Sequence, residues 1–402
     1  MIENEKLKMK ISNRGYVSEL VIKDDAYKMN WVMDDGYLKE AGYKEQDKLF
    51  GEFDIIADGT KISSNETIPQ IKKGDAKADI KYNFEKLSVE FIYDLQKRKD
   101  GLCWEVRVTN NTNEEISIDE FGIWISFAYV MFRDKNVEKN IHNSAAVFTS
   151  VSKNYTKLRR DGTSESLGMY QTVGETKSIG TYCAYRNLFF ENVSPSLDGM
   201  LFHKLYLSGG YEKNFQNHDW IYEKNGFALG ANEIKTWEYV INTNKTKDEF
   251  YENGLLLRHP FIEYTPLNII GETVRGRIKL PDGLKLLKVR AEYQSDNKVV
   301  NGEVTVNEET NGSYGFSFRP QHMGEHKIVF TFTNGTEDFT VLNVMDRLDK
   351  VIEERVQYIC NELYTGEDGN PACAFAPVSN QGESLGKANL VLKKNLLGTL
   401  DV

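Results

Sequence analysis

LSVEFIYDLQKRKDGLCWEVRVTNNTNEEISIDEFGIWISF, residues 87–127, is the stretch that decides the fold of this chain. Apolar side chains recur at every second position in it, and Lys-Asp-Gly at 99–101 and a polar turn at 110–113 interrupt them. The alternating positions are Val89, Phe91, Tyr93, Leu95, Leu102, Trp104, Val106, Val108, Ile116, Ile118, Ile123, Ile125 and Phe127. Period-two alternation over successive runs predicts an antiparallel sheet with one buried face.

The same pattern extends over residues 1–250 and predicts one large domain. Strands are expected at 6–11 and 16–22, joined by the Ser-Asn-Arg-Gly turn at 12–15, and again at 146–150, 167–172, 180–185, 201–207 and 235–241. The region contains no convincing long helical pattern. We therefore expect a β-supersandwich of the galactose-mutarotase-like type, larger than an immunoglobulin domain.

A second β module is expected at 255–345, after a polar segment at 242–253 that predicts a linker or a short helix. Its strands would cover 273–280, 287–293, 302–307, 313–319, 326–333 and 336–344. Asn-Gly at 311–312 and 334–335 are strong hairpin dipeptides. Turns at this spacing over some ninety residues predict a smaller immunoglobulin-like sandwich.

The pattern changes at Asp346. Leu348, Ile352, Val356 and Ile359 lie at helical spacing and predict an amphipathic helix, followed by a Gly-, Pro-, Ser- and Asn-rich segment and a second helix at 387–397. An apolar helix stripe must pack against something. We expect 346–402 either to dock on the sandwiches or to begin a truncated helical domain.

Composition excludes several classes of function. The chain has 402 residues and a net charge of −10, which disfavours nucleic acid and anionic membrane as partners. No apolar run is long enough for a membrane span, and the charged start predicts a cytoplasmic protein unless a processed N-terminus indicates secretion. The four cysteines form no CxxC pair and the six histidines no ligand motif, so no metal and no cofactor are expected.

Eight short segments, in five groups along the chain, together resemble a known family. They are ISNRGYV at 11–17 with MNWV at 29–32, LCWEV at 102–106 before Asn-Asn, HNS at 142–144 with LRRDG at 158–162 and SLG at 166–168, FALGANE at 227–233, and GEH at 324–326. In this order they are similar to an uncharacterised family of six-hairpin glycosidase-like proteins. The resemblance implies a mutarotase-like supersandwich, an immunoglobulin-like module and then an (α/α) barrel that carries the catalytic acids.

The chain departs from that family in length, because only one helical hairpin fits after Asp346. We therefore expect the non-catalytic front portion of a carbohydrate-active protein, with a helical catalytic domain in trans or self-association through the C-terminal helix. Two alternatives stay open. One is a mutarotase-like epimerase acting at the anomeric carbon, and the other is a protein-binding or assembly module.

Carboxyl pairs are the first candidates for chemistry, because glycosidic hydrolysis needs two of them facing one cleft. Asp24 with Asp25, and Asp34 with Asp35, are adjacent in sequence, and adjacent strand residues point to opposite faces. Glu52 and Asp54 would share a face if 50–56 is a strand, with a solvated face as the plainer interpretation.

Histidines, arginines and aromatic residues with polar neighbours complete the candidates. A histidine could act as an acid, an arginine could bind sugar oxygens, and an aromatic ring outside the core could stack on a pyranose. The candidate carbohydrate-binding residues are Trp31, His142, Tyr155, Arg159, Arg160, His218, Asp219 and Trp220. For each of them, core packing or a local turn contact is the alternative explanation.

Overall fold

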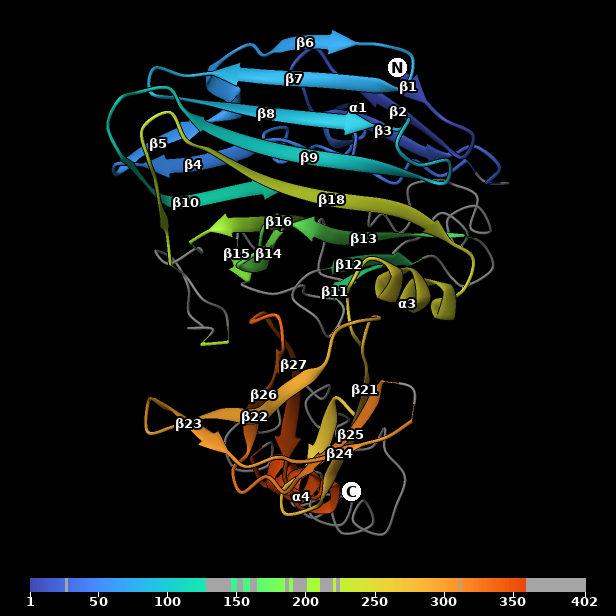
Figure 1. The fold of residues 1–402 in the computed structure, drawn as a ribbon, viewed down its shortest axis with the longest axis vertical. Helices are drawn as coiled ribbons and strands as arrows, with labels where there is room; N and C mark the ends of the chain where they lie inside the picture. The colour runs from blue at the N-terminus through green and yellow to red at the C-terminus, as the bar shows by residue number, and fades with distance from the viewer. Residues whose placement is uncertain are drawn as a thin grey trace, which may run out of the picture. The chain divides into compact units, whose positions relative to one another are not determined.

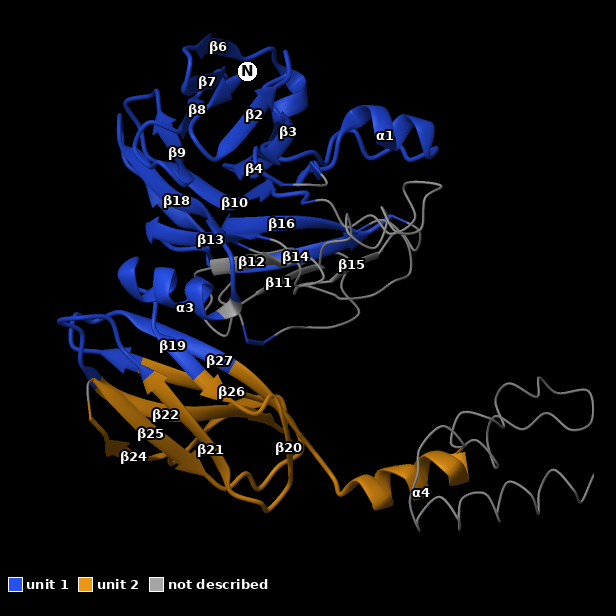
Figure 2. Cartoon of the chain, turned by 90° about the vertical axis from the view of Figure 1, so that its right-hand side faces the viewer, with its two compact units in different colours: residues 1–262, 279–286, 331–340 blue, residues 263–278, 287–330, 341–402 orange. Residues whose placement is uncertain are grey.

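The structure is a computed structural model that describes residues 1–25, 28–127, 165–184, 201–209, 220–221, 225–310 and 312–358. It gives the backbone alone for strands at 146–149, 155–159 and 188–190. Figure 1 shows the elements, and Figure 2 shows two units: residues 1–262, 279–286 and 331–340, and residues 263–278, 287–330 and 341–402. The domain limits predicted from the sequence stay predictions.

The first unit is built on two large sheets. One has the order β11-β12-β13-β18-β9-β8-β7-β6, and the other β15-β14-β16-β10-β4-β5, with β17 also paired to β10. The strands of the first are Ala146–Thr149, Tyr155–Arg159, Ser166–Val173, Ile234–Asn244, Gly101–Asn110, Leu87–Asp94, Lys77–Asn83 and Gln70–Lys73. Those of the second are Leu188–Phe190, Ser178–Cys183, Leu201–Ser208, Ile116–Trp124, Phe53–Ala57 and Thr60–Ser63, with β17 at Phe227–Leu229.

The two sheets share one core, which the alternation at 87–127 predicts. Trp104 lies fully buried in it, with its ring centroid 5.2 Å from that of Phe50 and 5.2 Å from that of Tyr239. Phe53 meets four further rings edge-on, those of Tyr82, Phe84, Phe91 and Phe121. Many of the aromatic residues of the sequence therefore lie inside the sandwich.

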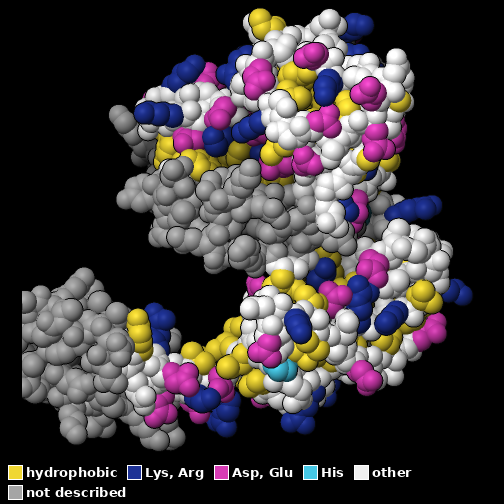
Figure 3. Space-filling model, turned by 90° about the vertical axis from the view of Figure 1, so that its left-hand side faces the viewer, with side chains coloured by type: hydrophobic (Ala, Val, Ile, Leu, Met, Phe, Trp, Pro, Cys, Tyr) yellow, Lys and Arg dark blue, Asp and Glu magenta, His cyan; other side chains and the backbone are white. Residues whose placement is uncertain are grey.

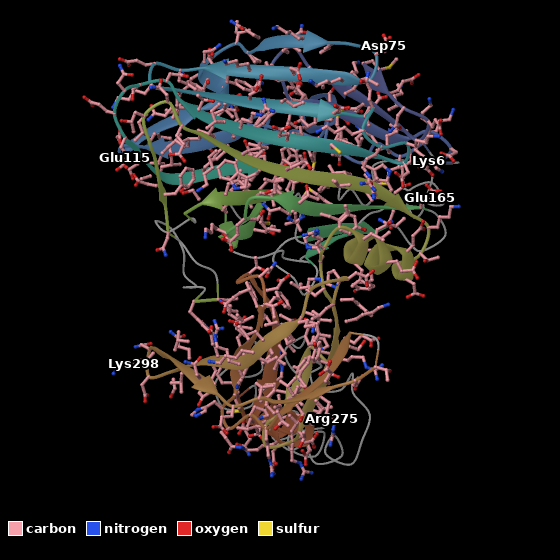
Figure 4. The ribbon with its side chains drawn as sticks, in the orientation of Figure 1. Lys6, Asp75, Glu115, Glu165, Arg275 and Lys298 are labelled. Carbon is pink, nitrogen blue, oxygen red and sulfur yellow. The ribbon has the colours of Figure 1, made fainter. Side chains whose placement is uncertain are left out.

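Smaller elements complete the unit. A three-stranded sheet holds β1 (Ile2–Glu3), β2 (Leu7–Ile11) and β3 (Val17–Ile22). Lys6 forms ion pairs with Asp24 and Glu165, and Figure 4 labels Lys6 and Glu165. A helix at Asp35–Glu40 (α1) is capped by Asp34, a short 3₁₀ helix covers Ser64–Glu66, and a helix at Lys247–Leu256 (α3) is capped by Thr246.

The smaller sandwich has sheets in the orders β19-β21-β25-β24 and β20-β27-β26-β22-β23. The first comprises Phe261–Tyr264, Val274–Lys279, Ser313–Phe318 and Thr305–Glu308. The second comprises Leu267–Ile269, Glu337–Met345, Gly324–Phe332, Leu286–Ser295 and Lys298–Gly302. Ile278, Phe316, Ile328 and Phe330 are buried between them. A helix, α4, follows at Leu348–Tyr358.

The predicted fold class is confirmed: the described chain is mainly β, with antiparallel sheets and few helices. Of the two alternatives for the polar segment at 242–253, the short helix is confirmed, because β18 continues to Asn244 and α3 covers Lys247–Leu256. The sequence analysis missed the strand β23 at 298–302. Among the described residues, no helix is both long and apolar enough to cross a membrane.

Candidate functional site

The sheet that contains β4, β10 and β16 has two chemically different faces. Phe53 and Ile55 of β4, Ile123 of β10 and Leu205 of β16 point into the shared core. The residues between them point outward, and on the outer face they include Asp54, Glu120 and Lys204. Strand alternation therefore places a charged cluster directly behind an aromatic core.

Lys204 is the centre of that outer cluster. Its Nζ lies 3.0 Å from an Asp54 carboxylate oxygen and 3.7 Å from a Glu120 carboxylate oxygen. The Lys204 side chain is 5% exposed, whereas those of Asp54 and Glu120 are 18% and 16% exposed. Because both carboxyls contact one ammonium, their nearest oxygens can be no further apart than the sum of these two distances.

A glycine lets the lysine reach both carboxyls. Lys204 is on β16 and Asp54 on β4, and β10 runs between these two strands. Gly122 of β10 stands opposite Asp54, and a Cβ placed on it would lie 2.3 Å from the Lys204 Cε. Any larger residue at 122 would therefore occupy the space through which the lysine stem crosses β10.

The environments push the two carboxyl pKa values in opposite directions. Burial acts to raise the pKa of Asp54, but Lys204 and Lys61 outweigh it and hold that pKa below its usual value. Burial raises the pKa of Glu120, and Lys204 only partly offsets this. The pKa of Asp54 is thus lowered while that of its neighbour Glu120 is raised, and an acid–base pair needs its two pKa values separated in this way.

Aromatic rings border the cluster. The Lys204 Nζ lies 5.1 Å from the ring centroid of Trp124 and 5.2 Å from that of Tyr206. Lys48 lies 5.6 Å from the Trp124 ring and 5.0 Å from the Tyr182 ring. These distances are typical of cation–π contacts. The segment around α1 covers part of this face, because Met33, Leu38, Leu49, Phe202 and Trp124 form a separate buried cluster.

Glu52 and Asp54 have different partners, and the Glu52 side chain does not lie on a solvated face. Strand β4 begins after Glu52, whose side chain is 1% exposed. Its carboxylate accepts from Arg14 at 2.6 Å and from the Leu49 N–H at 3.1 Å. Burial raises the pKa of Glu52 to about 8, although Leu49 and Arg14 oppose the shift.

The adjacent aspartate pairs have local roles. Asp34 accepts from the Tyr37 N–H as the cap of α1, and Asp35 pairs with Lys39 within that helix. Asp24 pairs with Lys6, and Asp25 accepts from the Met29 N–H. These contacts are helix-cap, turn and ion-pair interactions.

Trp31 is completely buried within the shared core. This is the location that its alternative explanation, core packing, expects. Trp31 stands next to Val32, which forms an isolated bridge with Phe127 and so brings this segment into the sandwich.

The other predicted site residues are not brought together by the described structure. Trp220 is half-buried. Tyr155 and Arg159 are in β12, where the register sets Tyr155 opposite Tyr170, and only their backbone is described. His142, Arg160, His218 and Asp219 lie outside the described residues. Their proposed roles stay predictions.

Sequence reasoning missed Glu120 and Lys204. A signal existed for the lysine, because LFHKLYLS at 201–208 is a strand that is buried at every position and contains one ammonium. A buried lysine requires a partner charge. Nothing in the sequence identified Glu120 as that partner. Among the described residues, no group of three or more His, Cys, Asp or Glu is placed to hold a metal ion.

Comparisons with known proteins show a likeness in fold. By sequence, no protein-family model and no curated protein matches this chain. A solved polysaccharide lyase superposes with a TM-score of 0.66 at 16% identity, covering 92% of this chain and 50% of the lyase. This chain thus spans about half the length of that enzyme, and at this identity the likeness concerns the fold alone.

Two further superpositions have TM-scores too low to support a conclusion about this chain. A protein provisionally assigned as an aldose 1-epimerase from Escherichia coli K12 gives a TM-score of 0.36 at 9% identity, over 60% of this chain and 97% of that one. The Lin-41 filamin domain gives 0.18 at 19% identity, over 22% of this chain and 93% of that domain. The likeness that the comparisons show is therefore the one in fold to the polysaccharide lyase, and no sequence family is found.

Proposed function

We propose that this chain is the non-catalytic β-sandwich portion of a carbohydrate-active protein, and that the outer face of the β4–β10–β16 sheet binds saccharide. The observation that carries the proposal is the Lys204 cluster, in which one ammonium and two carboxyls converge beside aromatic rings. Sugar hydroxyls both donate and accept hydrogen bonds, so they suit a site with charged donors and acceptors together. The fold likeness to a polysaccharide lyase supports the same class of ligand.

Solvent access supports binding at this place rather than in the core. Asp54 and Glu120 keep part of their side chains exposed, and Lys61, which lies 3.6 Å from Asp54, is 67% exposed. A saccharide hydroxyl could therefore reach the carboxyls without unfolding the sheet. The six-hairpin glycosidase-like resemblance adds that a helical catalytic domain would act on the ligand, either on the same protein or in trans.

Calorimetric titration against a panel of oligosaccharides tests the proposal. Glu120→Gln preserves shape and removes one charged acceptor, so binding should weaken about tenfold or more, since a hydrogen bond to a charged group is worth about 1.5–3 kcal/mol. Lys86→Met, which removes a lysine from an exposed pair with Asp58, is the matched control and should bind normally. Equal affinity of the wild type and Glu120→Gln for every bound sugar would overturn this site.

The opposed pKa shifts of Asp54 and Glu120 favour a second function, proton transfer at the anomeric carbon of a free sugar. In that case Asp54 would be the base and Glu120 the acid. Polarimetry of mutarotation decides between the two functions. Catalysis should fall about a hundredfold in Asp54→Asn and in Glu120→Gln. Sugar binding without any rate enhancement would leave only the binding function.

A further inference from the structure

We propose that the ε-amine of Lys235, held against Phe227 and beside the Lys177 ammonium, is a reactive site that condenses with small aldehydes to form an imine. Lys235 is the second residue of β18 and pairs with Val108 of β9. Trp237, two residues further along β18, lies in the shared core. Lys235 therefore points between the two large sheets, at the end where β18 begins. This inference does not depend on the proposed saccharide site.

A phenylalanine from the opposite sheet meets the lysine there. Phe227 of β17 pairs with Ile118 of β10, and the Lys235 Nζ lies 3.6 Å from the centroid of the Phe227 ring. The same Nζ lies 5.8 Å from the Trp237 ring centroid, and the two ring centroids are 5.8 Å apart. The rings thus hold the amine at one place between the sheets.

The Lys235 ammonium lacks a carboxylate partner. Within the part of the chain that the structure describes, it forms no ion pair, whereas Lys177 is paired with Glu175 at 2.9 Å. Keeping a partly buried ammonium without a partner costs free energy. The Phe227 ring offsets part of this cost, because its face attracts a cation. The remaining cost favours the neutral amine, which is the nucleophilic form.

Burial and a second ammonium lower the pKa of Lys235. Burial has the larger effect and Lys177 adds to it, while Glu233 and Glu175 only partly oppose the shift. Four other described lysines have a displaced pKa, and in each of them it is raised: Lys6, Lys8, Lys86 and Lys350. A desolvated lysine beside another cation is a known arrangement for a nucleophilic amine near neutral pH.

The amine is within reach of solvent although it points inward. Lys235 is only partly buried, and its neighbour Ile234 is 57% exposed. The start of β10, with which β17 pairs, directly follows Glu115. Figure 3 views the molecule from the side on which Figure 4 labels Glu115, and lysine or arginine side chains lie there directly beside apolar ones. A small aldehyde can therefore approach the amine without disrupting the core.

The reaction is a condensation that releases one water molecule. The lone pair of the neutral Lys235 amine attacks the aldehyde carbon, and a proton moves from nitrogen to the carbonyl oxygen to give a carbinolamine. The C–O bond then breaks, the hydroxyl leaves with the second N–H proton as water, and a C=N bond to Nζ remains. The Glu175 and Glu233 carboxyls, whose charges act on Lys235, are the neighbouring groups that can exchange these protons.

Reductive labelling of the full chain tests the proposal. Glyceraldehyde is the aldehyde, cyanoborohydride supplies the hydride that turns each imine into a stable secondary amine, and peptide mapping by mass spectrometry gives the rate at each lysine. At pH 7, Lys235 should be labelled at least about threefold faster than Lys288, an exposed lysine of β22. Labelling of Lys235 at the rate of Lys288 or slower would overturn the proposal.

The pH dependence provides a readout that needs no variant. The ratio of the Lys235 rate to the Lys288 rate should fall as the pH is raised from 7 to about 10, because the exposed lysine then also loses its proton. Taking the ratio cancels the effect of pH on the reducing agent. A ratio that stays constant with pH would contradict the proposal, because the difference would then reflect access alone.

A charge variant tests the part of the second ammonium. Lys177→Gln removes a positive charge beside Lys235 and releases Glu175 from its pair, so labelling of Lys235 at pH 7 should slow about threefold. Lys81→Gln removes an exposed lysine of β7 and is the matched control, which should leave the rate unchanged. Circular dichroism shows whether both variants are folded. Equal Lys235 rates in the two folded variants would overturn the proposed activation.

Discussion

The two faces of the β4–β10–β16 sheet differ by a single residue step and have opposite chemistry. On one face, Phe53, Phe121 and Leu205 bury apolar area against the second sheet. On the other face, Asp54 and Glu120 share the buried ammonium of Lys204. The apolar face gains stability from every atom it removes from water. The charged face is stable only because its partners are all present, since removing one leaves the others buried without compensation.

The largest expected effect is on the apolar face. Phe53→Ala should lower the free energy of unfolding by about 3–5 kcal/mol, because Phe53 is 1% exposed and its ring meets four others. Urea unfolding measures the change. Ile56 lies on the opposite face of the same strand and is only partly buried. Ile56→Ala is therefore the control and should cost about 1 kcal/mol. Equal losses would contradict the assignment of the two faces.

A buried carboxyl without a lysine should show a strong pH dependence. Glu52 has a pKa of about 8 in the folded chain against an ordinary 4.5, so between these values the folded state holds a proton that the unfolded state has released. The free energy of unfolding should therefore fall as pH rises from 4.5 to 8, by at most about 4 kcal/mol.

Glu52→Gln tests this, because it keeps an oxygen for the Leu49 N–H but cannot titrate. Urea unfolding at pH 5, 7 and 9 should give a flatter profile for the variant than for the wild type. Parallel profiles for the two proteins would mean that Glu52 is already ionised in the folded state and that Arg14 compensates its burial.

Removing the shared ammonium should have a somewhat smaller effect, which acid should also relieve. Lys204→Met fills the same space but leaves Asp54 and Glu120 facing each other, and it should cost about 2–3 kcal/mol at pH 7. Protonating the carboxyls removes their repulsion, so the loss should shrink as pH is lowered towards 4. A loss that does not depend on pH would point to packing rather than charge.

The smallest effect is expected at Gly122. Ala at this position would place its Cβ against the flexible end of Lys204, which can shift, so stability should fall by about 1 kcal/mol. The shift would move the ammonium away from the carboxyls, and saccharide affinity or mutarotation should respond more than stability does. Thermal unfolding and the binding titration, measured on the same variant, separate the two effects.

Much of the sheet arrangement could be predicted from single strands. The alternation of Val89, Phe91 and Tyr93 reports burial directly, because side chains of a strand point to opposite faces. Asp54 was also identified, since it stands in a short strand between apolar residues. The strand β23 was missed because its turn, Asp-Asn at 296–297, is a less distinctive hairpin signal than Asn-Gly, and its residues are exposed on both faces.

The candidate site was predictable only in part, and Trp31 and Lys204 show why. Trp31 has polar neighbours in sequence, yet it is buried because a distant segment, ending at Phe127, bridges beside it. Lys204 stands 150 residues from Asp54 along the chain. No local sequence pattern predicts which carboxyl a single buried lysine will contact in the folded chain.

By itself, the sequence determined that this protein is mainly β and where many of its strands with alternating apolar residues lie, because alternation and turn chemistry are local properties. Only the tertiary structure decided that Asp54, Glu120 and Lys204 meet, since strand order brings β16, β10 and β4 together from distant parts of the chain. Their pKa values follow from that meeting, because burial and neighbouring charge depend on packing rather than on sequence position.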